Sequence, residues 1–219
     1  MKLKDYEMLW KSLIHSSSDI GITDWWNKDK DIDKMISHLS DKDTPERMKI
    51  REIIRENNIS TILDAACGPA TEYASYLSEN LDINYTGLDR SDYMLKVAKQ
   101  RYADINFVKG NVEILPFEDN QFQAVLLKHI LEHLPTYENA VSESVRVASE
   151  LVIIHFFHAT LPLIEFDLNL KHKAGFWESW YSRKKFEKFL GSLPITHYER
   201  INIEGTSRQT AHIYLLKFS

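Results

Sequence analysis

The segment from Ile62 to Ala70 has the residue types of a ligand-binding turn. It reads Ile-Leu-Asp-Ala-Ala-Cys-Gly-Pro-Ala, so a short apolar run passes through Asp64 into small residues and then into a helical pattern. Small side chains allow a tight turn close to a ligand, and the start of a helix presents unpaired N–H groups to a carboxylate. We therefore expect a binding site at this turn, formed largely by backbone atoms.

A carboxylate follows the next apolar run, at the end of Gly87-Leu88-Asp89. In open parallel sheets, ligands bind beyond the carboxyl ends of the strands, and an acidic residue there can accept hydrogen bonds from both hydroxyls of a ribose. The alternative is that Asp89 only caps or turns the chain, as aspartates at strand ends often do. Both readings place it at the same edge of the sheet as the first turn.

Histidines follow the fourth apolar run, in the segment 128–134. A neutral imidazole can accept a proton from a reacting group, so His129 and His133 are candidate bases, and His155 and His158 are two more. The sequence does not choose among them. On a helix, His129 and His133 would share one face and could form a metal pair, but no third ligand lies nearby on that face, and we expect no metal site.

The elements that must position these residues begin near residue 60, where short apolar runs start to alternate with helical patterns. Such alternation is typical of βαβ units and a parallel sheet. Ser91 and Ser182 are the expected caps of two helices. The last two runs, linked through Gly205, predict an antiparallel hairpin at the sheet edge. The expected strands are 61–65, 83–88, 105–109, 122–127, 150–156, 195–204 and 209–218, with helices near 70–80, 91–102 and 136–148.

Residues 1–57 are expected to form a helical arm or lid, because apolar residues recur there at three- and four-residue steps. Thr44-Pro45 predicts the start of its third helix, with threonine as the cap and proline at the first helical position. Residues 58–219 then form the main domain, and 157–181 form an insert on the acceptor side. The whole chain is expected to be one structural unit.

Four segments, taken together, resemble the class I S-adenosylmethionine-dependent methyltransferases, particularly the subgroup similar to the ubiquinone and menaquinone biosynthesis enzymes. They are ILDAACGPA, TGLDRSDYML, GNVEILPFEDNQFQAVLLKHILEHL and the RV of SESVRVASELVII, within residues 60–156. The resemblance implies a Rossmann-like, three-layer α/β sandwich. It would have a seven-stranded, mostly parallel sheet with an antiparallel C-terminal edge strand. It also implies methyl transfer from S-adenosylmethionine to a small-molecule acceptor by in-line displacement.

The resemblance also assigns residue roles. Asp64 and the backbone of Ala66, Cys67 and Gly68 would surround the methionine part, and Asp89 would bind the ribose. Arg90 and Lys128 are further cofactor contacts, with Lys128 and His129 facing both cofactor and acceptor. Met94 and Val112 would pack on the adenine, with Asn111 at its amino group. Contacts to the acceptor are expected from Trp25, Trp26, His155 and Trp177.

The sequence departs from the family pattern where three alternating glycines are usual. This chain has Ala66, Gly68 and Ala70 there, and the turn remains possible if φ at the alanines stays negative. Asn111 stands where an acidic residue is common. The proline and glycines that usually precede the fifth strand are absent. A non-catalytic binding or scaffold domain of the same fold is therefore an alternative. A nicotinamide dehydrogenase is not favoured, because this sequence lacks the G-x-G-x-x-G fingerprint of such enzymes.

Aromatic residues gather in the arm and the insert, and two readings stay open for them: a lid over a flat or apolar acceptor, or packing between the arm and the sheet. They are Trp25, Trp26, Phe156, Phe157, Phe176, Trp177, Trp180 and Tyr181.

The 219 residues carry a formal net charge of −5, which does not favour binding to nucleic acid. A basic run at 171–188 is the local exception; it is read as a solvated helix face, or as a contact for an anionic acceptor. No signal peptide or membrane span is expected, and the lone Cys67 agrees with a cytoplasmic location. The sequence leaves the oligomeric state open.

Overall fold

The computed structural model describes residues 41–156, 160–171, 177–203 and 212–218. Most of the expected N-terminal arm lies outside these ranges, so its division from the main domain stays a prediction. In chain order, the helices are α3 (Pro45–Glu56), α4 (Thr71–Ser78), α5 (Asp92–Arg101), the 3₁₀ turn η2 (Leu131–His133), α6 (Glu138–Val147) and α7 (Arg183–Leu190). The strands are β1 (Thr61–Ala65), β2 (Asn84–Asp89), β3 (Asn106–Lys109), β4 (Phe122–Lys128), β5 (Ala148–His155), β6 (Leu168–Lys171), β7 (Trp177–Trp180), β8 (His197–Asn202) and β9 (His212–Lys217).

Seven strands form one sheet in the order β3-β2-β1-β4-β5-β9-β8. The pairs from β3 to β5 are all parallel, while β9 runs antiparallel to both β5 and β8. The C-terminal hairpin therefore makes the expected antiparallel edge, with β9 inserted between β5 and the edge strand β8. The strand order reverses at β1 and β4, which is where an open α/β sheet opens its binding crevice.

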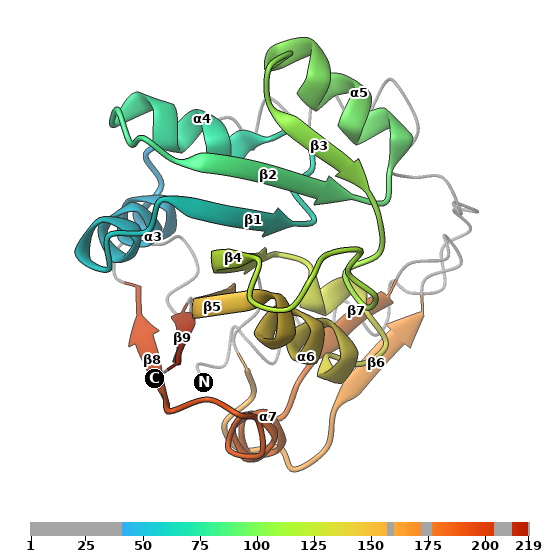
Figure 1. Cartoon of the computed structure of the whole chain (residues 1–219). Coiled ribbons are helices and arrows are strands. Elements are labelled where there is room, and N and C mark those ends of the chain that lie inside the picture. The colour runs from blue at the N-terminus through green and yellow to red at the C-terminus, as the bar shows by residue number, and fades with distance from the viewer. Residues whose placement is uncertain (1–40, 157–159, 172–176, 204–211, 219) are drawn as a thin grey trace.

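Helices cover both faces of this sheet (Figure 1). Apolar residues of α3, α4 and α5 form one core cluster with one face of the strands, and those of α6 and α7 form a second cluster with the other face. The central strands are buried on both sides, which explains their continuous apolar runs. These layers confirm the Rossmann-like three-layer fold.

Two of the three predicted helix caps are confirmed. The Ser91 hydroxyl accepts a hydrogen bond from the Met94 N–H at 3.2 Å, and Ser182 accepts one from the Lys185 N–H at 3.4 Å. The expectation for Thr44 was wrong. Pro45 does begin α3, but the Thr44 hydroxyl makes no capping hydrogen bond and has no partner within the described residues.

The insert contains an element that the sequence analysis did not predict, the β6–β7 hairpin. Its register pairs Leu168 with Trp180 and Lys171 with Trp177, and β7 packs against η2. Among the described helices, none has both the length and the apolar composition needed to cross a bilayer.

Candidate functional site

The turn after β1 is held directly to the end of β2. The backbone N–H groups of Ala66 and Cys67 both donate to the Leu88 carbonyl, at 2.8 and 2.9 Å. The Gly68 N–H donates to Oδ2 of Asp89 at 2.9 Å. The two segments expected to hold one ligand therefore converge on the same place.

The alanines of this turn do not keep a negative φ, which was the condition under which the sequence analysis allowed the turn. Ala66 has φ 79°, Gly68 has φ 52° and Ala70 has φ 60°, all in the left-handed region. All three positions of the turn therefore have left-handed backbone, two of them with alanine. Each alanine costs about 1–2 kcal/mol of backbone strain relative to a right-handed conformation. A Cβ added at Gly68 would meet no atom within 4 Å, so its backbone faces open space.

Asp89 links the turn to the start of α5. Its second oxygen, Oδ1, accepts from the Ser91 N–H at 2.8 Å. Burial raises the pKa of Asp89, and the hydrogen bonds from Ser91 and Gly68 act in the opposite direction. Each carboxylate oxygen retains a lone pair, so Asp89 serves both readings, as a structural turn residue and as an acceptor for a ligand hydroxyl.

A cavity of about 440 Å³ opens beside this junction. Its size lies in the usual range for small-molecule sites. Its wall contains every residue expected at the cofactor and both candidate bases of the fourth strand: Asp64, Ala66, Cys67, Gly68, Asp89, Arg90, Met94, Asn111, Val112, Lys128, His129 and His133. It also contains residues that the sequence analysis did not predict as site residues: Arg47, Pro69, Thr71, Glu72, Ser91, Gly110, Ile130 and Leu134.

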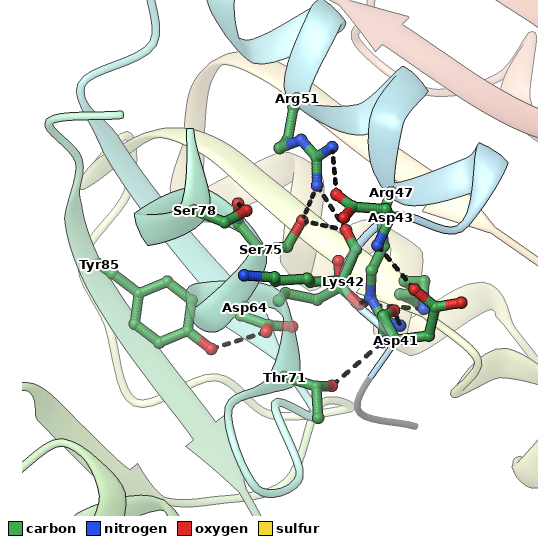
Figure 2. Close-up of polar contacts among 12 residues, drawn as sticks. Asp41, Lys42, Asp43, Arg47, Arg51, Asp64, Thr71, Ser75, Ser78 and Tyr85 are labelled. Carbon is green, nitrogen blue, oxygen red and sulfur yellow. Dashed lines mark hydrogen bonds and ion pairs between the residues drawn. The ribbon is translucent and has the colours of Figure 1, made fainter. Parts of the chain in front are cut away.

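Asp64 lies at the bottom of the turn, buried near the end of β1. Its Oδ2 accepts a 2.7 Å hydrogen bond from the Tyr85 hydroxyl (Figure 2). Burial raises the pKa of Asp64 to about 7, with the charge of Glu72 acting in the same direction and that of Lys128 against it. This carboxyl can therefore gain or lose a proton near neutral pH.

Glu72, at the start of α4, joins two cations in the cavity wall. Its Oε1 lies 2.7 Å from Nε of Arg47 and 3.0 Å from Nζ of Lys128. Burial alone would raise the pKa of Glu72, but the charges of Lys128 and Arg47 lower it below the usual value. Glu72 is therefore ionised, and α3, α4 and β4 are tied together at the cavity.

Two buried arginines of α3 hold the chain that precedes the helix. Arg47 donates to the Asp41 carbonyl and to the Thr71 hydroxyl, and Arg51 donates to the Lys42 carbonyl, to Asp43 and to Ser75 (Figure 2). These contacts bind residues 41–43 to α4. Arg47 reaches the cavity from this cluster, which fixes its guanidinium.

The histidines do not share a helix face, so the geometry of an i, i+4 pair is absent. His129 follows β4 with φ 56°, and His133 ends η2. Within the described ranges, no group of three or more His, Cys, Asp or Glu side chains could hold a metal. Burial lowers the pKa of His129 well below 6.5, with Lys128 next in effect, so its ring is neutral.

His133 is oriented by the insert. Its Nδ1 lies 3.2 Å from the backbone carbonyl of Trp177. Because a carbonyl only accepts, this contact requires a proton on Nδ1. The insert therefore reaches the site through the backbone of Trp177.

His155 lies behind His129 and outside the cavity wall. The two rings are 4.9 Å apart, and burial lowers the pKa of His155 well below 6.5. Phe156 and Tyr181 belong to the core cluster beneath α6 and α7, and Trp180 packs on Leu161. These three aromatics are therefore packed within the described part of the fold, and packing of this cluster against the arm stays a prediction. Trp25, Trp26, Phe157, His158 and Phe176 lie outside the described residues.

A sequence signal for Arg47 was available. Arg47, Ile50, Arg51 and Ile54 fall on one stripe of α3, and all four are buried. Two arginines on the apolar face of a helix indicate paired, buried guanidinium groups rather than a solvated surface. Glu72 gave no such signal, because an acidic residue in a first helical turn is common.

Comparison with known proteins adds independent findings. Residues 63–154 match a family described as a methyltransferase domain. The demethylmenaquinone methyltransferase of Paenarthrobacter aurescens is 36% identical over 157 residues, covering 70% of this chain and 53% of that protein. The one from Renibacterium salmoninarum is 38% identical over 102 residues, covering 45% of this chain and 42% of that protein. The chain thus spans about half the length of these curated relatives.

Solved structures share the fold at low identity. A putative S-adenosylmethionine-dependent methyltransferase from Methanococcus maripaludis aligns with a TM-score of 0.64 and 16% identity, covering 93% of this chain and 96% of that one. A S-adenosylmethionine-bound amino pentose methyltransferase from Micromonospora echinaspora aligns with a TM-score of 0.63 and 12% identity, covering 100% and 98%. Fold, motif order and the matched family model agree that residues 63–154 belong to the methyltransferase-domain family, and the two curated relatives are named demethylmenaquinone methyltransferases.

Proposed function

We propose that the chain is a methyltransferase that uses S-adenosylmethionine to methylate a small, flat, apolar acceptor of the quinol class. One observation carries the proposal: the 2.9 Å hydrogen bond from Gly68 N–H to Asp89, which brings the turn after β1 and the carboxylate after β2 into one cavity wall. Small residues at such a turn and an acid at the next strand end are what an adenosyl ligand requires.

The residues present fit this cofactor. Gly68 presents bare backbone to open space, and Asp89 retains lone pairs for the ribose hydroxyls. Met94 and Val112 supply buried apolar surface for the adenine. Asn111 Oδ1 already accepts from the Glu113 N–H at 3.1 Å and has a second lone pair for the adenine amino group.

When bound, S-adenosylmethionine supplies a methyl group whose carbon is activated by the positive sulfonium. The protein must align the acceptor with it and accept a proton. His133 is the first candidate for that role, because it lines the cavity and the Trp177 carbonyl, 3.2 Å from Nδ1, orients its ring. His129, neutral and in the same wall, is the second candidate.

The acceptor class rests on two observations. Ile130 and Leu134 complete the wall around the two histidines, so this end of the cavity suits an apolar ring. The curated relatives of residues 63–154 are named for demethylmenaquinone. Removing a hydroxyl proton from a reduced quinone ring raises the electron density at the neighbouring ring carbon, which is the role proposed for the histidine.

The proposal includes a cytoplasmic location. Cys67 is a free thiol in the cavity wall. A reducing compartment would keep it from oxidation beside the ligand.

Titration calorimetry tests the proposal directly. Wild type should bind S-adenosylmethionine and S-adenosylhomocysteine but not NAD. Asp89→Ala should weaken both by at least about 10-fold, because a charged acceptor of ligand hydroxyls is lost. The matched control is Asp92→Ala, three residues further on and largely exposed; its affinity should stay within about 2-fold.

Transfer of labelled methyl from S-adenosylmethionine to a short-chain demethylmenaquinol separates enzyme from scaffold. Binding with transfer supports the proposal, and binding without transfer to this acceptor or to other small quinols supports the scaffold reading. Binding of NAD in place of the adenosyl ligands would reject the cofactor.

A further inference from the structure

His155 is a buried imidazole to which the proposed reaction gives no role. It is the last residue of β5, and it is 4% exposed. Neither of its ring nitrogens, Nδ1 or Nε2, has a hydrogen-bond partner within the described residues. Buried polar atoms without partners destabilise the folded protein, which indicates a hydrogen bond that forms only when the site is occupied.

The ring beside it belongs to His129, which lines the cavity. The two ring centroids are 4.9 Å apart, with an angle of 42° between the ring planes. Two imidazoles joined by an N–H···N hydrogen bond have centroids roughly 5 Å apart, since the bond measures about 2.9 Å and each nitrogen lies on the rim of its ring. The rings of His129 and His155 are therefore at the right spacing, and they need only turn in place to form this bond.

The backbone holds the two residues in this relation. Lys128, the last residue of β4, pairs with His155 in the sheet, and the N–H of His129 donates to the His155 carbonyl at 3.0 Å. This bond supports the left-handed conformation of His129, which has φ 56°. Such a conformation is uncommon for a residue other than glycine, and it occurs preferentially at functional sites.

Both rings are neutral. Burial lowers the pKa of His155 well below 6.5, and the charges of Lys128, His212 and Arg47 act in the same direction. The pKa of His129 is lowered in the same way, first by burial and then by Lys128. A neutral imidazole has one N–H and one lone pair, so one bond between the rings still leaves a nitrogen of His129 for a ligand.

We propose that His155 is a positioning residue for His129: when the acceptor is bound, His155 accepts a hydrogen bond from the N–H of His129, whose other nitrogen then accepts from an acceptor hydroxyl. A nitrogen that meets a hydroxyl donor must present its lone pair, so the proton of His129 lies on the nitrogen that bonds His155.

The inference rests on the proposed function and deepens it in one respect, the oxidation state of the acceptor. A quinol ring has two hydroxyls, so His129 can hold one while His133 takes the proton of the other. The carbonyls of an oxidised quinone only accept, and they would meet a lone pair of His129 instead of a donor. The two histidines therefore select the reduced ring.

Two ligands that differ only in these groups isolate the contact: a short-chain demethylmenaquinol and the corresponding demethylmenaquinone. Anaerobic calorimetry on the full chain, saturated with S-adenosylhomocysteine, should give wild type at least about 10-fold higher affinity for the quinol. His155→Phe keeps a ring against His129 but removes both nitrogens, so this preference should fall by at least about 5-fold. His155→Gln has an amide oxygen that can accept from His129, and its preference should stay within about 3-fold of wild type.

The matched control is His197→Phe, on the exposed edge strand β8, where the ring of His197 stacks on Tyr198 with centroids 6.5 Å apart. It makes the same substitution beside another ring and should leave both affinities unchanged. Retained binding of S-adenosylhomocysteine reports that each variant is folded. If His155→Phe does not bind it, the smaller His155→Leu takes its place with the same expectation.

Two outcomes would overturn this inference while leaving the proposed function intact. One is an unchanged preference in His155→Phe, or equal losses for the quinol and the quinone. The other is a preference lost as fully in His155→Gln as in His155→Phe, since a role in packing alone would give that result. Failure of wild type to bind either ring would instead reject the proposed acceptor class, and this inference with it.

Discussion

The left-handed backbone of Ala66 and Ala70 destabilises the binding turn locally. Both residues have positive φ, and Ala66 lies in the cavity wall. The hydrogen bonds from Ala66 and Cys67 to the Leu88 carbonyl hold the turn in this form. Strain of this kind persists only where the surroundings determine the conformation, and it marks sites that approach a ligand closely.

Ala66→Gly should therefore stabilise the protein. Relief of left-handed strain favours the folded state by about 1–2 kcal/mol, and the greater freedom of glycine in the unfolded chain offsets about 0.4–1 kcal/mol. We expect a net gain of about 0.5–1 kcal/mol in the free energy of unfolding, measured by urea denaturation. Ala65→Gly, in the buried strand β1, is the control and should destabilise. A loss of stability in Ala66→Gly would contradict the strain argument.

Asp64 predicts a pH dependence of stability with a definite sign. Its pKa is about 7 in the folded protein and close to 3.9 when unfolded, so the folded state binds the proton more tightly. The tighter binding of this proton stabilises the folded state in full below the unfolded pKa, and this stabilisation is lost as pH rises through the folded pKa near 7. Between pH 5 and 8, wild type should lose about 2–3 kcal/mol of stability relative to Asp64→Asn. Parallel stability curves for the two proteins would show that the pKa of Asp64 is not raised.

His133→Gln tests the proposed proton acceptor. The glutamine retains polarity but cannot accept the proton, so the turnover of a demethylmenaquinol should fall by about 100-fold or more. The affinity for S-adenosylhomocysteine should stay within about 2-fold. His197→Gln, on the edge strand β8 and exposed, is the control. Unchanged turnover in His133→Gln would show that His133 is not the proton acceptor. The role would then belong to His129, or no histidine would have it.

At the residue scale, the sequence located the cavity but not its charge pairing. Asp64, Gly68 and Asp89 were predicted because their segments occur together in the order and spacing of a known family, although each residue alone has other common uses. The partners of Glu72 were not predictable, since α3 lies outside the alternating βαβ pattern and its distance from α4 and β4 depends on tertiary packing. The sign of φ at Ala66 was missed for a related reason, because alanine by itself favours negative φ.

At the element scale, the β6–β7 hairpin supports the histidine end of the cavity. The Tyr181 hydroxyl lies 2.8 Å from the carbonyls of Leu131 and Leu134, and Ser179 donates to the Leu134 carbonyl at 2.8 Å. These bonds fix η2, which carries His133 and precedes Leu134 in the wall. The hairpin was not predicted, because its strands are short and its aromatic residues suggested a lid. The longer strands of the main sheet were predictable from their apolar runs.

Tyr181→Phe should weaken the contact between the β6–β7 hairpin and η2. Loss of the hydroxyl leaves two buried carbonyls with one donor fewer, so we expect a loss of about 1–2 kcal/mol in the free energy of unfolding. The KM for the acceptor should rise, and the affinity for S-adenosylhomocysteine should change little. Tyr198→Phe, on β8, should alter neither quantity. If Tyr181→Phe weakens binding of the cofactor as much as binding of the acceptor, the hairpin does not act on the histidine end of the cavity alone.

At the scale of the whole molecule, the sheet topology brings the residues of the cavity wall together. The strand order reverses between β1 and β4, and the cavity wall draws on α3, β1, α4, β2, α5, β4 and η2. Strain at one turn and buried charges between helices are concentrated there, while the rest of the sheet has an apolar core on both faces. Such local departures from ideal folding rules are expected at functional sites.

A crystal structure with S-adenosylhomocysteine bound tests the central claim most directly. We predict the ribose at Asp89, the adenine between Met94 and Val112, and the amino acid end beside Asp64 and Gly68, with the sulfur towards His129 and His133. A ligand bound elsewhere on the protein, or a cavity that stays empty at saturating ligand, would contradict the account.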